Sequence, residues 1–65
     1  MKLFEVTGSY GFGARVCEQF ETLTEARALV SKMSSGTIWF LSTAGRVRME
    51  TRDQAIRQAF PQEAR

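Results

Sequence analysis

Thr37-Ile38-Trp39-Phe40-Leu41-Ser42-Thr43 is the stretch that decides the fold of this chain. Four consecutive large apolar residues lie between hydroxylated ones, and a short run so rich in aromatic and β-branched side chains is typical of a strand that is apolar on both faces. In a strand, Ile38 and Phe40 point to one side of the sheet, while Trp39 and Leu41 point to the other. The helices of the same chain can cover one of these sides. We therefore expect the second side to be covered by another molecule.

The chain has 65 residues, which make one domain whose core is only marginally stable without a disulfide, a bound metal or a partner chain. Because it contains a single cysteine, Cys17, and no histidine, we expect no intramolecular disulfide and no transition-metal site. Because it has no nucleotide-binding motif, we also expect no cofactor. A homodimer is the remaining source of stability. The free thiol suits a reducing compartment, and no segment approaches the ~20 apolar residues of a membrane span. We expect a cytoplasmic protein, of a bacterium or of a virus-infected host.

Three further strands are predicted on either side of the central one. Residues 2–7 and 14–20 alternate between apolar and polar positions, and they form an antiparallel hairpin around a glycine-rich loop. Residues 46–50 form the return strand of a second hairpin. Its alternation directs Val47 and Met49 toward the core and directs the charged residues outward, namely Arg46, Arg48 and Glu50.

Two helices are predicted from capping boxes, in which a threonine and the residue three positions later satisfy each other's backbone N–H groups. The boxes are Thr22 with Glu25 and Thr51 with Gln54. The first helix buries the apolar stripe Ala26, Leu29, Val30 and Met33, and we expect Gly36 to end it in a left-handed conformation. The second helix buries Ala55, Ile56, Ala59 and Phe60, and Pro61 ends it.

The predicted fold is an α+β two-layer sandwich with the element order β-β-α-β-β-α. Both hairpins join in one four-stranded antiparallel sheet, and the two helices cover one face of it. We expect residues 1–61 to form this single domain and residues 62–65 to form a flexible C-terminal tail.

No motif for catalysis or cofactor binding is present. The glycines of the first loop do not match a phosphate-binding pattern, and that loop leads into a strand where phosphate sites need a helix N-terminus. Cys17 has no histidine to activate it. The carboxylates that lie close together in the sequence are best interpreted as solvated charge, namely Glu18, Glu21 and Glu25. We therefore expect that the chain is not an enzyme.

Two surfaces are candidates for a protein interface. One is the sheet face opposite the helices, which carries Leu3, Trp39 and Leu41 and would expose contiguous apolar surface. The alternative is that Trp39 belongs to the core, because the helices divide between the faces or the sheet curls. The other surface is the glycine-rich loop with its neighbouring residue, where residue types common in interfaces lie together, namely Tyr10, Phe12 and Arg15.

Nucleic-acid binding is the alternative to protein binding. The net charge of +2 is mild, but the excess is C-terminal and consists of arginine. Trp39 could serve as a stacking platform beside such a patch. Glu50 and Asp53 neutralise part of the field. The residues that would form the patch are Arg46, Arg48, Arg52 and Arg57.

The first half of the chain resembles HicB antitoxins. A strand, a Gly-Tyr-Gly-like loop, a strand and the helix opening Phe20-Glu21-Thr22-Leu23-Thr24-Glu25-Ala26 look like the start of their partial ribonuclease-H-type fold. The chain lacks the proline- and cysteine-bearing segment that this family has between strand and helix. We carry no function over from the resemblance.

We expect a small non-enzymatic protein-binding module that occludes or clamps a macromolecular partner as a homo-oligomer. Small domains without catalytic residues, with aromatic side chains on a loop and a sheet face, fit what phages and mobile elements encode against host machinery, including anti-defence inhibitors. This biological setting is an analogy and does not follow from the physics of the chain. The alternatives are the arginine-based nucleic-acid binder and an antitoxin-like regulatory module.

Overall fold

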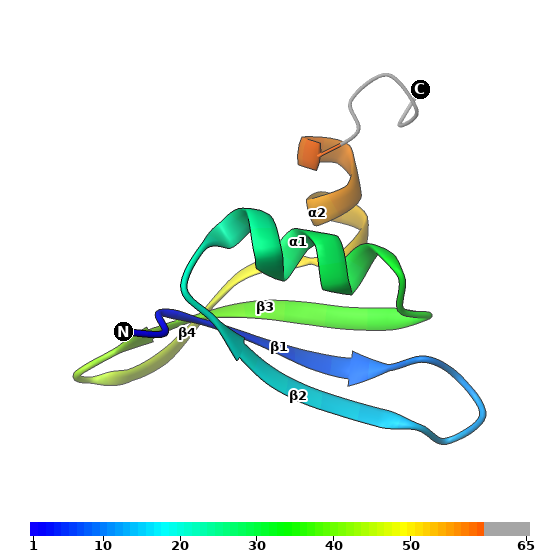
Figure 1. Ribbon diagram of the computed structural model, residues 1–65, viewed down its shortest axis with the longest axis horizontal. Coiled ribbons are helices and arrows are strands. Elements are labelled where there is room, and N and C mark those ends of the chain that lie inside the picture. Colours follow the sequence, from blue (N-terminus) through cyan, green and yellow to red (C-terminus); the bar gives the residue numbers. More distant parts are fainter. Residues whose placement is uncertain (60–65) are drawn as a thin grey trace.

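A four-stranded antiparallel sheet carries both helices on one of its sides in the computed structural model, which describes residues 1–59 (Figure 1). The elements are β1 (Phe4–Ser9), β2 (Arg15–Phe20), α1 (Leu23–Ser31), β3 (Ser35–Ser42), β4 (Gly45–Thr51) and α2 (Arg52–Ala59). The predicted α+β class and element order are confirmed. The expected helix end at Pro61 and the tail at 62–65 lie outside the described residues.

The strand order is β2-β1-β3-β4, so the apolar stretch that decides the fold occupies an inner strand. Because antiparallel neighbours pair residue by residue, side chains line up in rows across the sheet. The row on the helix side consists of Phe20, Phe4, Phe40 and Val47. The row on the helix-free side consists of Gln19, Glu5, Trp39 and Arg48. The prediction that Phe40 and Trp39 face opposite sides is confirmed.

A β-bulge in β4 changes the alternation that the sequence predicts. Trp39 pairs with Arg48 whereas Ile38 pairs with Glu50, so Met49 is the extra residue of β4. The prediction that Met49 faces the core and Glu50 faces solvent is therefore wrong. Glu50 lies on the helix side and accepts two hydrogen bonds from the guanidinium of Arg27, with 2.9 Å between Nε and Oε1. Met49 is 41% exposed.

Both helices begin at the predicted capping boxes. The Thr22 hydroxyl accepts a hydrogen bond from the Glu25 N–H (3.2 Å) and donates one to the Glu25 carboxylate (2.9 Å). At the second box, the Thr51 hydroxyl accepts from the Gln54 N–H (3.4 Å), and the Gln54 side-chain oxygen accepts from the Thr51 N–H (2.9 Å). Each box lies at the end of a strand, within two residues of the last residue of β2 and at the last residue of β4, so the chain turns there into the helix. No helix within residues 1–59 is long and apolar enough to cross a membrane.

The core lies between α1, α2 and the inner strands. Its fully buried members are Val6, Ala26, Val30, Met33, Ile38 and Ala55. The prediction for Gly36 is wrong, because α1 ends at Ser31 with the right-handed residue Lys32 as its C-cap, and Gly36 lies in β3, opposite Gly8. A Cβ atom at Gly36 would lie 2.6 Å from Val30 Cγ2, which is closer than van der Waals contact. Gly36 therefore serves close packing of the helix on the sheet.

Candidate functional site

The helix-free face of the sheet is built around Trp39. Its indole N–H donates a hydrogen bond to the hydroxyl of Thr7 on β1 (2.8 Å), which fixes the orientation of the ring. The guanidinium carbon of Arg46 lies 4.3 Å from the ring centroid, and Arg46 Nη1 is 2.9 Å from Glu5 Oε1. A cation over an aromatic ring is attracted by the negative face of the ring. Arg46 therefore covers part of the indole, and Trp39 is half-buried although no helix lies over it.

Glu5 joins three strands of this face. Besides Arg46, its carboxylate accepts hydrogen bonds from two β2 side chains, Gln19 (3.4 Å from Nε2) and Cys17 (3.8 Å from Sγ). This role of Glu5 is not predicted by the alternation of residues 2–7. A carboxylate in the middle of an inner strand, on the same face as the only tryptophan, is the signal that could have revealed it. The face is consequently amphipathic, with a polar network around the indole.

The predicted apolar residues of this face lie together. The antiparallel register of β1 and β3 continues past β1, because the Leu41 N–H donates to the Leu3 carbonyl (2.8 Å). Leu3, Trp39 and Leu41 therefore adjoin one another, and all three are half-buried. We call these three residues the apolar sheet patch. It is smaller than the sequence implies, because Arg46 pairs with Leu41 in the sheet and reaches over the adjacent ring.

Phe12 is the most exposed aromatic side chain of the described residues. It is 106% exposed, and its φ of 55° is the one positive value among non-glycine residues of this part of the chain. Its neighbours Gly11 (φ 89°) and Gly13 (φ 79°) also have positive φ values. A left-handed backbone costs a residue with a Cβ atom about 1–2 kcal/mol. The left-handed backbone of Phe12 therefore costs free energy, and within residues 1–59 the exposed phenyl ring makes no packing contacts that would offset this cost.

The base of this loop is held firmly. The Tyr10 N–H donates to the Ala14 carbonyl (3.1 Å), and the Ala14 N–H donates to the Gly11 carbonyl (3.0 Å). The Ser34 hydroxyl, from the segment after α1, donates to the Tyr10 carbonyl (2.8 Å). These bonds fix both ends of the turn, so Phe12 is carried on an ordered support.

The loop and the apolar sheet patch are separate surfaces. Tyr10 and Phe12 lie beyond the C-terminal end of β1, whereas Leu3 precedes its N-terminal end, and Figure 1 shows these ends on opposite sides of the molecule. Tyr10 and Arg15 are both exposed, and Arg15 opens β2 opposite Ser9. The structure thus keeps the three predicted loop residues in one region, which we call the Phe12 loop and which comprises Tyr10, Phe12 and Arg15.

The four arginines of the nucleic-acid hypothesis do not come from one surface. Arg46 and Arg48 pair with Leu41 and Trp39 on the helix-free face. Arg52 and Arg57 belong to α2, which lies on the other side of the sheet (Figure 1). Arg46 is also neutralised by Glu5. This division weakens the basic patch that single-stranded nucleic acid would need.

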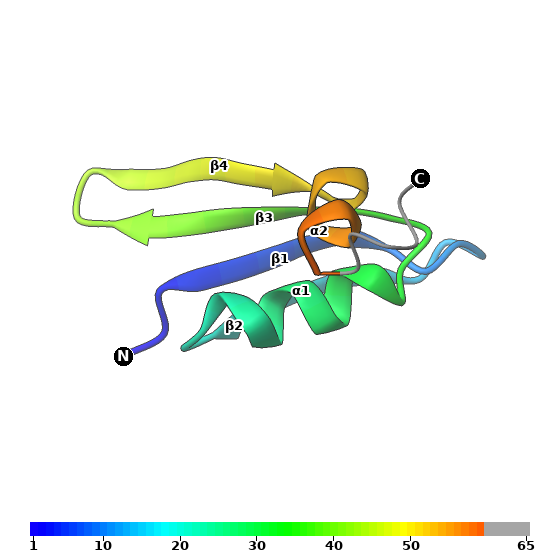
Figure 2. The same cartoon turned by 90° about the horizontal axis from the view of Figure 1, so that it is seen from above.

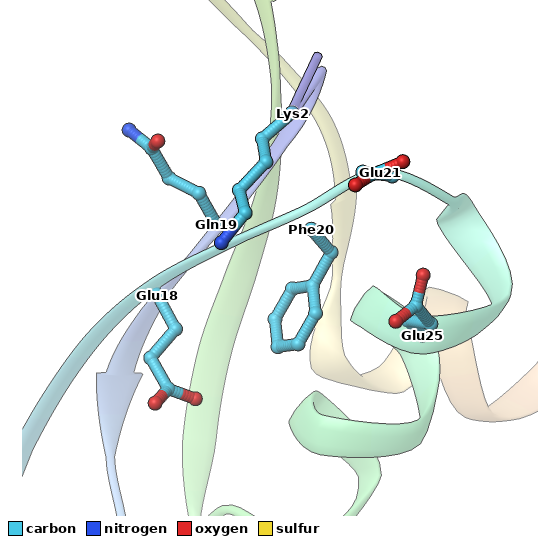
Figure 3. A pocket seen from close by; sticks show the side chains of 6 residues that line it. All are labelled: Lys2, Glu18, Gln19, Phe20, Glu21 and Glu25. Carbon is cyan, nitrogen blue, oxygen red and sulfur yellow. The ribbon is translucent and has the colours of Figure 1, made fainter.

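A shallow pocket of about 510 Å³ opens between β2 and the start of α1 (Figure 3). It is lined by Lys2, Glu18, Gln19, Phe20, Glu21 and Glu25. Its three carboxylates are all exposed, and that of Glu25 accepts the hydrogen bond from Thr22. Solvated carboxylates lack the desolvation that adapts such groups to acid–base catalysis. Within residues 1–59, no cluster of three or more Asp, Glu, His or Cys residues could hold a metal ion.

No protein-family model, curated protein or solved structure matches this chain.

Proposed function

We propose that this chain is a small non-enzymatic protein-binding module whose main contact residue is Phe12. The observation that carries the proposal is the left-handed, fully exposed Phe12 on a loop whose base is hydrogen-bonded to Ser34. Backbone strain that persists without an intramolecular benefit is characteristic of functional positions. Binding a partner supplies the missing benefit, because the phenyl ring then leaves water.

The composition of the Phe12 loop supports a protein as the partner. Tyrosine, phenylalanine and arginine are enriched at the centres of protein interfaces, where a few side chains carry most of the binding energy. The hydrogen bonds at the base of the loop lower the entropy that binding costs, because the loop is already ordered. A module of this kind acts by covering a functional surface of its partner. Inhibition of a host complex by a phage or mobile element is the biological setting that we propose.

Self-association through the apolar sheet patch is a second part of the proposal. Leu3, Trp39 and Leu41 form a contiguous half-buried group on a sheet face that carries no helix. Pairing two such faces around a two-fold axis would bury both patches together with the Arg46 side chain that lies over each Trp39. We expect Leu41→Arg to give a monomer or an unfolded chain in sedimentation experiments. A stable, native wild-type monomer at micromolar concentration would contradict the dimer.

The binding proposal is tested by affinity capture with variants of the Phe12 loop. We expect Phe12→Ala and Tyr10→Ala to lose a partner that the wild-type chain captures from the lysate of its host, while the melting temperature stays unchanged. Thr24→Ala is the matched control, because Thr24 is also exposed but lies on α1. A partner retained by Phe12→Ala would refute the role of the loop.

The same preparation tests the nucleic-acid alternative. Binding to a single-stranded oligonucleotide should be absent or weak if the proposal is right. Affinity that falls steeply with salt and is lost on combining Arg46→Glu with Arg48→Glu would support the alternative instead.

A further inference from the structure

β4 is an edge strand with an unusual exposure of apolar side chains. It pairs only with β3, and Val47 (58% exposed) and Met49 are among the large exposed hydrophobic residues of the described chain. Figure 2 shows that neither helix extends over the turn end of the β3–β4 hairpin. The opposite edge, β2, differs because its exposed side chains are Arg15, Cys17, Glu18 and Gln19. Exposed apolar edges are normally avoided, since they invite pairing with another strand.

The two side-chain rows that cross the sheet, one on the helix side and one on the helix-free side, both end at exposed residues of β4. On the helix side the row of three phenylalanines, in which Phe4 and Phe40 meet edge to face at 5.9 Å, ends at exposed Val47. On the helix-free side, the row through Glu5 and Trp39 ends at Arg48. Within residues 1–59, Arg48 makes no ion pair, whereas Arg46 is paired with Glu5. The free edge of β4 thus presents the exposed apolar side chain of Val47 next to Arg48, which has no ion-pair partner among residues 1–59.

We propose that the free edge of β4 binds an extended acidic segment of another protein as a fifth strand. A large apolar residue of that segment opposes Val47 and continues the phenylalanine row. The residues on either side of it point to the helix-free face, where an aspartate or glutamate opposes Arg48. The recognised pattern is therefore acidic, apolar, acidic, with main-chain hydrogen bonds supplying affinity and the alternating side chains supplying specificity.

In the register centred on Val47, which would continue the phenylalanine row, a second copy of this chain does not fit the same edge. Antiparallel pairing of two β4 strands around Val47 would set Arg46 of each copy opposite Arg48 of the other. Like charges directly opposite each other destabilise a strand pair. The inference is also independent of the Phe12 loop, which lies at the far end of the molecule from the β3–β4 turn (Figure 1).

The test uses a fluorescent peptide of about ten residues in which glutamate and valine alternate, a length that matches a typical strand. Two control peptides are a scrambled isomer of the same composition and a version with lysine in place of glutamate. We expect saturable anisotropy changes with the first peptide only. In hydrogen exchange, the peptide should slow the amides of β4 and leave those of β2 unchanged.

Variants separate this edge from the other surfaces. We expect Val47→Lys and Arg48→Glu to weaken peptide binding about tenfold or more, which corresponds to about 1.4 kcal/mol. Peptide binding should be unchanged by Arg15→Glu, the equivalent charge reversal on β2, and by Phe12→Ala. The peptide experiment therefore tests the β4 edge independently of the proposal for the Phe12 loop. Circular dichroism verifies that each variant is folded.

Four results would overturn the inference. The first is equal affinity for all three peptides. The second is unchanged binding by both β4 variants, and the third is displacement of the peptide by a single-stranded oligonucleotide. Protection, in the wild-type protein alone, of the β4 amides that point away from β3 would also overturn it, because a second copy would then occupy the edge.

Discussion

Arg46 lies over the indole ring of Trp39, with its guanidinium carbon 4.3 Å from the ring centroid, and reaches across the ring to the carboxylate of Glu5. This arrangement explains how a short chain covers a large aromatic residue on a sheet face without a helix. The cation replaces part of the apolar cover, and the carboxylate keeps the cation in place. On this face, a partner would therefore need to cover only the edges of the indole and the two adjacent leucines.

Arg46→Gln should expose the indole. We expect a shift of the tryptophan emission to longer wavelength and a loss of about 1 kcal/mol of stability, since the cation–π contact and the partly exposed ion pair are both removed. Trp39 is the only tryptophan, so the emission reports on this site alone. Arg48→Gln is the control on the same strand and face. An unchanged emission wavelength in Arg46→Gln would show that Arg46 does not shield the ring.

Much of the fold can be predicted from short sequence patterns. Both helices begin at the predicted threonines, because Thr22 and Thr51 need only a local partner three residues later. The second box is complete, whereas at the first the Glu25 carboxylate accepts from the Thr22 hydroxyl and not from its N–H. The stretch around Trp39 becomes an inner strand because its apolar residues on two faces suit that position best. These features depend on neighbours in the sequence, so the sequence alone determines them.

The rest depends on tertiary contacts that periodicity cannot reveal. The bulge at Met49 moves Glu50 to the helix side, where Arg27 of α1 binds it, and strict alternation gives no sign of that shift. Gly36 looks like a helix terminator by position, but contact with Val30 determines its role. The placement of Arg46 over Trp39 follows from side-chain packing across two strands. At the Phe12 loop, the aromatic residues were predicted, but the left-handed backbone of Phe12 was not.

The ion pair between Arg27 and Glu50 should contribute measurably to stability. Both side chains are mostly buried, with 24% and 14% exposed, and two hydrogen bonds join them. We expect Arg27→Ala or Glu50→Ala to cost about 1–2 kcal/mol in urea unfolding, because each leaves a poorly solvated charge unpaired. The double variant should cost less than the sum of the two. Strict additivity would indicate that the pair contributes nothing.

The pH dependence of this pair follows from the guanidinium. The hydrogen bond that Arg27 donates to the Glu50 carboxylate raises the pKa of Arg27 above its usual range. A raised pKa in the folded state contributes stability that is complete below the unfolded pKa and is lost only as pH rises through the folded value. Between about pH 6 and about pH 10, the difference in stability between wild type and Arg27→Ala should therefore stay constant. Loss of that difference near about pH 10 would contradict this assignment.

Gly36→Ala should disturb the packing of α1 on the sheet. The added Cβ atom would lie 2.6 Å from Val30 Cγ2, so one of the two elements has to shift. We expect a loss of about 1–3 kcal/mol in thermal or urea unfolding. Val30→Ala removes the clashing methyl group, and in that background the cost of Gly36→Ala should be smaller. An undiminished cost in the double variant would assign the effect to the backbone of β3 instead.

Phe12→Gly should separate stability from binding. Glycine adopts positive φ freely, so the substitution removes a cost of about 1–2 kcal/mol, although the more flexible unfolded chain offsets about 0.4–1 kcal/mol of that gain. We therefore expect the free energy of unfolding to rise by about 0.5–1 kcal/mol, while the partner captured through the Phe12 loop is lost. Phe12→Ala keeps the left-handed cost, so it should lose the partner without the gain in stability. A substantial loss of stability in Phe12→Gly would mean that the phenyl ring packs within the molecule, and the case for a binding loop would then fail.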